Sequence, residues 1–422
     1  MTGPRLDRRD HALLSGANGP AAALAMEILV ALAYAVDAPH FIDVERAHID
    51  GCLYHGEAGL DFATRLVALG ARVTIPTTLN VSSLDLLHPD RFRGDPATAR
   101  AARALMDAYV EMGCQPTWTC APYQSPDRPL FGQHIAWAES NAIVFANSVI
   151  GARTDRYGDF SDICAAITGR VPYAGFHRTE RRRGDVAFDL AGVKGSLLGS
   201  DVLYPVLGHL AGRECGTAVP VFSGLPPNAD EDRLKALGAA AASSGAVALF
   251  HAVGITPEAT TLDDALHGTP PARTIEVTMA DLRAARDDLS SMSDGSLIAV
   301  SLGTPHFSVT EFETFASLIG GRTFAPAIDV WVNTSRAVLD QVRASGILES
   351  CQNAGARIIT DTCNYITPIL RRRDGIVMTS SAKWAYYAPG NIGVDVAFGS
   401  LTDCVESAVA GTVVRDPELW SD

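Results

Sequence analysis

Two cysteines far apart in the chain occupy positions where a thiolate could bind a ligand. Cys120 lies in residues 117–123 and Cys363 in residues 361–365, and at both places an apolar segment gives way to a loop of small and polar residues. Such a loop can hold a thiolate in place while leaving it accessible. If the fold brings the two thiols together, they suit an iron site. Taken alone, each is more often a packed thiol, because free cysteine is among the most buried residue types.

Cys52 is a third candidate ligand. Glycines flank it in residues 50–56, where they let the backbone approach a ligand closely, and Tyr54 and His55 in the same segment are further pocket candidates. A tight turn around a packed cysteine explains the segment equally well. The remaining five cysteines lie in helix-like or apolar surroundings and are interpreted as structural: Cys114, Cys164, Cys215, Cys351 and Cys404.

The elements that must position these residues alternate between helices and strands. Residues 20–36 and 60–69 read as helices, the first with Pro20 near its start. Short apolar runs that follow helices are predicted strands, at residues 71–76, 142–146, 246–250, 297–301 and 356–360. This alternation predicts an α/β fold of several lobes, with mainly parallel sheets flanked by helices.

Polar segments follow these predicted strands. They contain Asn80, then Ser148, Arg153 and Thr154, then His306 in Gly303-Thr304-Pro305-His306, and finally Cys363. Because ligands of open α/β sheets bind outside the carboxyl ends of the strands, we expect the segments to converge on one cleft. For residues 303–308 the alternative is a capped helix with Ser308 at its N-terminus.

Two further segments carry groups that bind anions. Arg153 belongs to a run of charges that usually forms surface ion pairs, but arginine is also the natural partner of a substrate carboxylate. Residues 379–390 combine hydroxyls, including Ser381, with one lysine, Lys383, and a Pro-Gly loop. They lack the glycine spacing of a nucleotide phosphate loop, so an anion site of another kind is predicted.

Composition excludes several classes of protein. The chain has 422 residues, 47% hydrophobic and 19% charged, and a net charge of −14, which argues against nucleic acid or an anionic membrane as a partner. Eight cysteines without a Cys-x-x-Cys pair exclude a disulfide scaffold and a zinc ribbon. The charged N-terminus and the short apolar run at residues 20–36 predict a cytoplasmic protein without a membrane span.

The length predicts more than one lobe. A basic stretch at residues 177–185 is the best internal boundary, which gives a first α/β lobe at residues 1–180 and a second part at residues 181–422 that completes the site.

Taken together, the motifs resemble the catalytic large subunit of aconitase X, a branch of the aconitase superfamily. The resemblance runs from about residue 11 to residue 411. It rests on residues 47–51, 77–80, 118–123, 139–142, 147–154, 303–306, 361–363 and 381–383.

The resemblance implies a hydro-lyase that uses iron or an iron–sulfur cluster as a Lewis acid on a small hydroxy acid. Cys120 and Cys363 match the metal cysteines of the family, and Cys52 is a further possible ligand. The implied catalytic residues are Lys383, His306 and Ser381. The implied substrate-binding residues are Asn80, Arg153, Thr154, Tyr54, His55 and Ser148.

The sequence departs from the family in two respects. Family members often have cysteine where this chain has Thr304, so either Cys52 completes the site or the centre is a smaller cluster or a single iron. The large-subunit pattern also fills the chain and leaves no room for the small swivelling domain of the family. We therefore expect a separate small subunit and low activity from this chain alone.

Two dehydrations are associated with the family. Residues 80–85 and 152–159 are more similar to the bacterial branch that dehydrates cis-3-hydroxy-L-proline. The alternatives are an enzyme acting on mevalonate 5-phosphate and a non-catalytic, ligand-binding member in which Thr304 marks the loss of a metal ligand.

Overall fold

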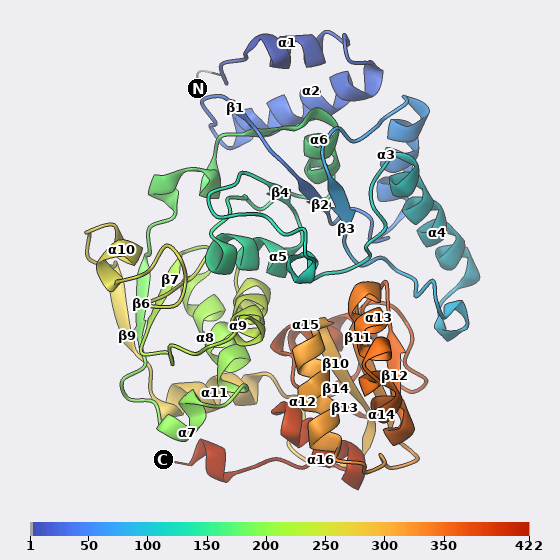
Figure 1. The fold of residues 1–422 in the computed structure, drawn as a ribbon, viewed down its shortest axis with the longest axis vertical. Helices are drawn as coiled ribbons and strands as arrows, with labels where there is room; N and C mark the ends of the chain where they lie inside the picture. Colours follow the sequence, from blue (N-terminus) through green and yellow to red (C-terminus); the bar gives the residue numbers. More distant parts are fainter. Residues whose placement is uncertain (1–2, 422) are drawn as a thin grey trace. The chain divides into compact units, whose positions relative to one another are not determined.

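The computed structural model describes residues 3–421, and the chain divides into two compact units (Figure 1). Unit 1 contains the described residues up to Leu84 together with Gly94–Arg183. Unit 2 contains Asp85–Arg93 and the described residues from Gly184 onward.

Unit 1 is built around a short parallel sheet of order β3-β2-β4, in which Ala47 pairs with Thr77 and with Ala136. A separate antiparallel pair joins β1 to β5. The helices of unit 1 are α1 (Arg8–Leu14), α2 (Pro20–Ala35), α3 (Glu57–Ala68), α4 (Pro96–Glu111), α5 (Ser140–Phe145) and α6 (Ser161–Thr168). Its strands are β1 (Phe41–Asp43), β2 (Ala47–Ile49), β3 (Thr77–Leu79), β4 (Ala136–Trp137) and β5 (Arg170–Pro172).

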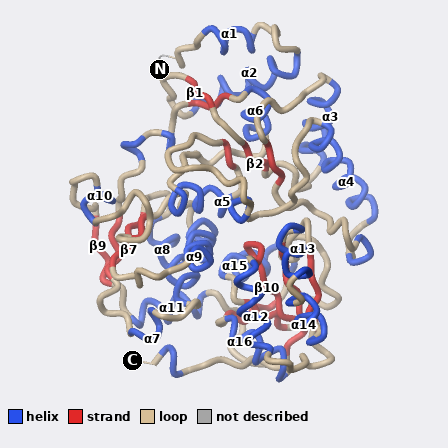
Figure 2. Tube along the Cα trace, in the orientation of Figure 1, coloured by secondary structure: helices blue, strands red, loops and turns tan. Residues whose placement is uncertain are grey.

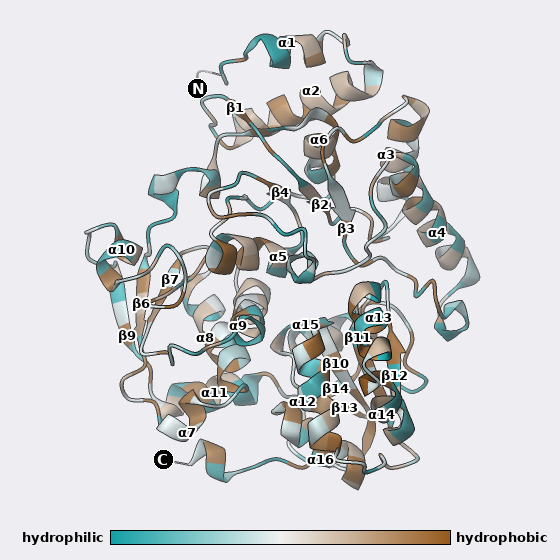
Figure 3. Ribbon diagram, viewed as in Figure 1, coloured by the Kyte–Doolittle hydropathy of each residue, from teal (hydrophilic) through white to brown (hydrophobic). Residues whose placement is uncertain are grey.

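Helix α2 forms much of the core of unit 1. Pro20 opens it at a position where a missing backbone N–H costs nothing, and α2 packs against α6. Figure 3 shows α2 mostly on the hydrophobic side of the scale, in keeping with its buried residues Met26 and Leu29. Burying this apolar surface is the main source of stability in this part of the chain.

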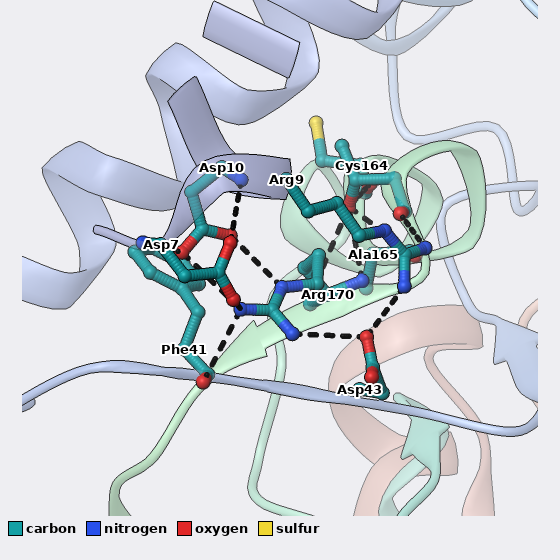
Figure 4. Close-up of polar contacts among 9 residues, drawn as sticks. Asp7, Arg9, Asp10, Phe41, Asp43, Cys164, Ala165 and Arg170 are labelled. Atoms are coloured by element: carbon teal, nitrogen blue, oxygen red, sulfur yellow. Dashed lines mark hydrogen bonds and ion pairs between the residues drawn. The ribbon is translucent and has the colours of Figure 1, made fainter. Parts of the chain in front are cut away.

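An ionic network ties α1 to strands β1 and β5 (Figure 4). The guanidinium of Arg170, whose side chain is 6% exposed, donates to Asp10 at 2.9 Å, to Asp43 at 2.9 Å and to Asp7 at 2.7 Å. Burial opposes the charge, yet the hydrogen bonds that Arg170 donates to Asp10 and Asp43 raise the pKa of Arg170 above its ordinary value. Arg170 therefore holds three carboxylates, one of them fully buried.

Replacing Arg170 with methionine is expected to destabilise unit 1 by about 3–5 kcal/mol, because the buried Asp10 would lose its counter-ion. Urea denaturation measures the change. Arg9→Met is the matched control: Arg9 also bonds to Asp43, at 2.6 Å, but it is half exposed, and we expect a loss below about 1 kcal/mol. Equal losses in the two variants would contradict the network's proposed role.

Unit 2 contains two parallel sheets. The first has the order β8-β7-β6-β9 and the second the order β12-β11-β10-β13-β14. The strands are β6 (Val186–Asp189), β7 (Pro220–Ser223), β8 (His251–Ala252), β9 (Arg273–Glu276), β10 (Leu297–Phe307), β11 (Asp329–Thr334), β12 (Ala356–Ile359), β13 (Ile376–Thr379) and β14 (Asp395–Phe398).

Helices cover both sheets of unit 2. They are α7 (Gly195–Leu198), α8 (Leu203–Cys215), α9 (Glu231–Ser244), α10 (Leu262–Leu266), α11 (Met279–Asp288), α12 (Val309–Ile319), α13 (Arg336–Ala344), α14 (Ile347–Ala354), α15 (Ala382–Ile392) and α16 (Leu401–Ala410). Figure 2 shows the strands around β10 lying among helices α12, α14 and α16. All eleven residues of β10 are buried, as expected for a central strand covered on both faces. The predicted α/β class with mainly parallel sheets is confirmed.

Several predicted elements are right and three are wrong. The strand expected at residues 71–76 begins only at Thr77, because the amides of Val73 and Thr74 bond to Met112 and Ala166 instead of a sheet ladder. Residues 142–145 form the end of helix α5 and Ala146 begins a π-helical segment, whereas residues 246–250 lead into the short β8 without forming a strand.

Between residues 3 and 421 no helix is long and apolar enough to cross a membrane.

Candidate functional site

His306 and Cys363 lie together in unit 2. Strand β10 continues to Phe307, so Gly303-Thr304-Pro305-His306 belongs to the strand and not to a loop as predicted. Cys363 follows strand β12 at its carboxyl end, as expected. Both residues are buried, and their ligand atoms lie within 4.8 Å of each other. A cysteine and a histidine at this separation could bind one metal ion.

The ring of His306 is oriented by a backbone carbonyl. Its Nε2 lies 3.3 Å from the oxygen of Thr362, which can only accept, so Nε2 carries the proton. This contact fixes the tautomer and the orientation of the ring. This arrangement, a histidine fixed through its second nitrogen, is the usual one for metal-binding histidines.

The turn before Cys363 is held by an ion pair. Asp361 adopts a left-handed conformation with φ of 63°, which aspartate tolerates better than most residues. Its carboxylate accepts two hydrogen bonds of 2.7 Å from Arg336 and a third of 3.1 Å from the amide of Leu86. These contacts fix the direction in which the chain enters the Cys363 turn.

Asn364, next to Cys363, carries a donor without a partner. Its Oδ1 accepts hydrogen bonds from Ser301 at 2.8 Å, from Trp384 at 3.0 Å and from Asn333 at 3.3 Å. These donors fix the amide orientation, because a flipped amide would face them with its own hydrogens. The buried Nδ2 then points where no described residue accepts from it. A buried N–H beside a cysteine could serve a thiolate or a bound anion.

Ser381 and Lys383 lie at the start of helix α15. Ser381 is the N-cap: its hydroxyl accepts from the amide of Trp384 at 3.0 Å and donates to the backbone oxygen of Thr304. Lys383 is buried in the first turn. A cavity of unit 2 is lined by both residues together with Ser380, Gly303 and Thr304. The predicted pair thus adjoins the Gly303-Thr304-Pro305-His306 strand.

A charge cluster around the buried Lys235, next to His306, was not predicted from the sequence. Lys235 on α9 donates to Asp232 at 2.7 Å, to Glu311, and to the backbone oxygen of His306 at 3.4 Å. Burial raises the pKa of Glu311 to about 7, although Lys235 opposes the shift. Burial would also raise the pKa of Asp232, but Lys235 holds it below its ordinary value. The hydroxyl of Ser308 donates to Asp232 at 2.6 Å, which closes the cluster around the end of β10.

Cys120 lies in unit 1, in a turn that side chains hold from behind. Its backbone oxygen accepts from the side-chain Nδ2 of Asn141 at 2.9 Å, and the Oδ1 of Asn141 accepts from the hydroxyl of Tyr123 at 2.6 Å. The ring of Tyr123 stacks on Phe145 with centroids 3.8 Å apart. The turn is therefore rigid, as the accessible-thiolate hypothesis requires, while Cys120 itself is buried.

Asn80 follows strand β3 in unit 1, and its side chain has an unsatisfied acceptor. Its Nδ2 donates to Asp50, which fixes the amide orientation. Its buried Oδ1 accepts from no residue that the structure describes. Amides of Asp50 and Gly51 donate to Asp162 at 2.8 and 3.1 Å, which anchors this loop. A substrate hydroxyl or ammonium group would satisfy Asn80.

Cys52 has the environment of a packed thiol. Its Sγ lies 3.5 Å from the oxygen of Ile49 and 3.4 Å from that of Asn80, both acceptors. Burial, and then the charge of Asp50, raise the pKa of this thiol well above its usual value. A protonated thiol is a poor metal ligand. These contacts are those expected of the packed turn, and the role of Cys52 as a metal ligand stays a prediction.

The other predicted residues of unit 1 lie on different segments of the chain. Tyr54 is partly buried and His55 is exposed, in the loop after β2. Ser148 is buried on a π-helical segment (Ala146–Ile150) that continues from α5, not in a loop after a strand. The hydroxyl of Thr154 accepts from the amide of Trp137 at 3.0 Å, so it supports strand β4. Arg153 donates to the oxygen of His177 at 3.1 Å and to Thr179 at 2.8 Å.

Models of the three aconitase X domains match most of the chain. The first domain matches residues 3–180, the second residues 184–287 and the third residues 297–410. A solved structure, the holo-form of Thermococcus kodakaraensis aconitase X, superimposes with a TM-score of 0.86 at 33% identity, covering 96% of this chain and all of that one.

Curated relatives fall into two groups. The cis-3-hydroxy-L-proline dehydratase of Pseudomonas aeruginosa is 46% identical over 99% of this chain and 72% of its own length. The enzyme of the same name from Hypocrea jecorina is 41% identical over 96% of this chain and 69% of its own length. The phosphomevalonate dehydratase large subunit of Methanothermobacter thermautotrophicus is 38% identical over 93% of this chain and 96% of its own length. All three names bear out the predicted reaction class, a dehydratase. This chain belongs to the aconitase X family.

Proposed function

We propose that this chain is the large catalytic part of an iron-dependent hydro-lyase that dehydrates cis-3-hydroxy-L-proline. The observation that carries the proposal is the 46% identity, over 99% of the chain, to a protein of that name. The relatives named for phosphomevalonate reach 38%. The difference favours the hydroxyproline substrate over the alternative.

We propose that His306 and Cys363, whose ligand atoms lie within 4.8 Å of each other in unit 2, hold the iron centre. We propose Cys120 as a further ligand because it matches a metal cysteine of the family. Two thiolates and one imidazole are a donor set that suits iron or a small iron–sulfur cluster. The orphaned Nδ2 of Asn364 supports the fit, because a buried donor beside Cys363 can hydrogen-bond to a thiolate or sulfide. Thr304 then contributes no metal–sulfur bond, and His306 takes the place of the third ligand.

The chemistry assigned to an iron centre here is Lewis-acid polarisation of the substrate hydroxyl. The protein must remove a proton from the carbon adjacent to the one that loses hydroxide. Lys383, buried in the first turn of α15, is our candidate for that proton transfer. Ser381 caps the helix and bonds to Thr304, so we assign it the role of placing Lys383.

The substrate contacts proposed for unit 1 follow from its unsatisfied and cationic groups. Asn80 offers a buried acceptor to the ring ammonium or the hydroxyl of the amino acid. Arg153 is proposed to bind a carboxylate, with Tyr54, His55 and Ser148 as further contacts. Thr154 is proposed to act indirectly, through its support of strand β4.

We propose that a small swivelling domain completes the site. Relatives named "large subunit" support a separate partner chain. The Pseudomonas relative has further sequence beyond the 72% of its length that this chain matches. We expect low activity until a small domain or subunit is added.

A substrate panel tests the proposal. With iron and a small domain supplied, we expect kcat/KM for cis-3-hydroxy-L-proline to exceed that for mevalonate 5-phosphate by about 100-fold or more, because a site built to pair the polar groups of one substrate leaves them unpaired with the other. The trans isomer is the control. A preference for mevalonate 5-phosphate would establish the alternative substrate, and binding without turnover would establish a non-catalytic member.

A further inference from the structure

We propose that Thr304 and the first turn of α15 form a binding subsite for an anionic oxygen group, and that this group is the carboxylate of the substrate. The inference rests on the proposed function and extends it, since it assigns the position where a metal cysteine was expected to substrate binding. All the residues involved belong to unit 2.

The hydroxyl of Thr304 is buried and without a partner. The residue is 4% exposed, and its Oγ1 makes no hydrogen bond to any part of the chain that the structure describes. Its backbone oxygen is occupied, because the hydroxyl of Ser381 donates to it. An unpaired buried hydroxyl is costly, so a bound acceptor is its natural partner.

Helix α15 offers positive potential beside this hydroxyl. It has 11 residues, its first turn contains no acidic residue, and its amide N–H groups carry the positive end of the helix dipole. Lys383 lies in that turn and is 5% exposed. Thr304, Ser380, Ser381 and Lys383 line one cavity, so the hydroxyl of Thr304 and the first turn of α15 share a common space.

The other charges that line this cavity balance one another. Lys235 and Glu311 also contribute to its wall, but Lys235 is bonded to both Glu311 and Asp232. Their mutual pairing neutralises that side of the cavity, and the dipole of α15 makes the start of this helix the side that attracts an anion. A carboxylate there would accept from the Thr304 hydroxyl and the helix amides together.

The subsite also suits the reaction. A carboxylate bound at Thr304 would lie two positions before His306, the proposed metal ligand, and in the cavity that Lys383, the proposed proton-transfer group, also lines. Fixing the carboxylate orients the neighbouring carbon, whose proton must leave. We therefore expect Thr304 to contribute mainly to substrate binding.

The test is calorimetric binding of cis-3-hydroxy-L-proline, its carboxamide and mevalonate 5-phosphate to the full chain and to three variants. Thr304→Val keeps the shape and removes the hydroxyl, Thr304→Ser restores a hydroxyl, and Thr314→Val is a matched control on the exposed face of α12. Iron content is measured for each.

We expect Thr304→Val to weaken binding of the hydroxyproline about tenfold or more, with unchanged iron content and little change for the carboxamide. Thr304→Ser should recover most of the affinity, and Thr314→Val should bind like the wild type.

Equal affinities of wild type and Thr304→Val for the hydroxyproline would overturn the subsite, as would a loss of iron in Thr304→Val. If the chain binds mevalonate 5-phosphate instead, and only Thr304→Val weakens that binding, the anion subsite stands while the proposed substrate fails. A chain that binds neither anion would overturn both proposals.

Discussion

Changing Cys363 to alanine is expected to remove bound iron and to lower the dehydration rate by at least about 100-fold. Altering groups that merely support a metal ligand commonly costs 10- to 100-fold, so losing a ligand itself should cost more. The thiol follows strand β12 and lies within 4.8 Å of the ligand atom of His306. Iron analysis after anaerobic reconstitution, combined with a turnover assay, measures both effects.

Cys351→Ala provides the matched control. Cys351 is also a buried cysteine of unit 2, but it packs in the apolar core on α14, where burial raises the pKa of its thiol to about 11. We expect this variant to lose about 1 kcal/mol of stability and to keep its iron. Iron retained by Cys363→Ala, or lost equally by both variants, would refute the role of Cys363 as a ligand.

Replacing Lys235 with methionine is expected to destabilise unit 2 by about 3–5 kcal/mol. The ammonium is buried between Asp232 and Glu311, and its removal would leave two partly buried carboxylates without a cation. Urea denaturation followed by tryptophan fluorescence measures the loss. Lys194→Met is the control, because Lys194 makes its 2.9 Å bond to Ser421 at the surface and its loss should change stability by less than about 0.5 kcal/mol.

The deficit of Lys235→Met should depend on pH. The folded-state pKa of Glu311 is raised from 4.5 to about 7, and removing Lys235 should raise it further. When the pKa of a group is higher in the folded than in the unfolded protein, its contribution to stability is fully present below the unfolded pKa. That contribution is lost as the pH rises through the folded pKa. The deficit should therefore be larger at pH 8 than at pH 5.5. A pH-independent deficit would show that Glu311 does not carry it.

Residues close together in the sequence were enough to predict where a helix begins when a capping residue or a proline sets its start. Ser308 is the N-cap of α12, as the alternative for residues 303–308 had it, and Glu311 completes a capping box there. Pro20 opens α2 for the same kind of reason. The apolar run at residues 142–146, in contrast, fits a strand and a helix equally. The side chain of Glu139 decides the outcome by accepting from the amide of Ala142 at 2.8 Å, which starts helix α5.

Contacts between distant residues were beyond sequence reasoning. Lys235 precedes His306 by 71 positions, and nothing in the residues around Lys235 indicates that it is buried beside that strand. The orphaned donors of Thr304 and Asn364 are likewise visible only when every neighbouring acceptor has been placed. Residue types and strand ends indicated the proposed ligands Cys363 and His306, whereas the groups that orient them depend on tertiary packing.

The central proposal, an iron-dependent dehydratase of cis-3-hydroxy-L-proline, is tested most directly by one measurement. The chain, supplied with a small domain, is assayed for water elimination from this substrate before and after removal of iron by a chelator, and again after iron is restored. We predict turnover with iron, loss of turnover without it, and recovery on reloading. Equal turnover by the iron-free protein, or none by the iron-loaded protein, would contradict the proposal.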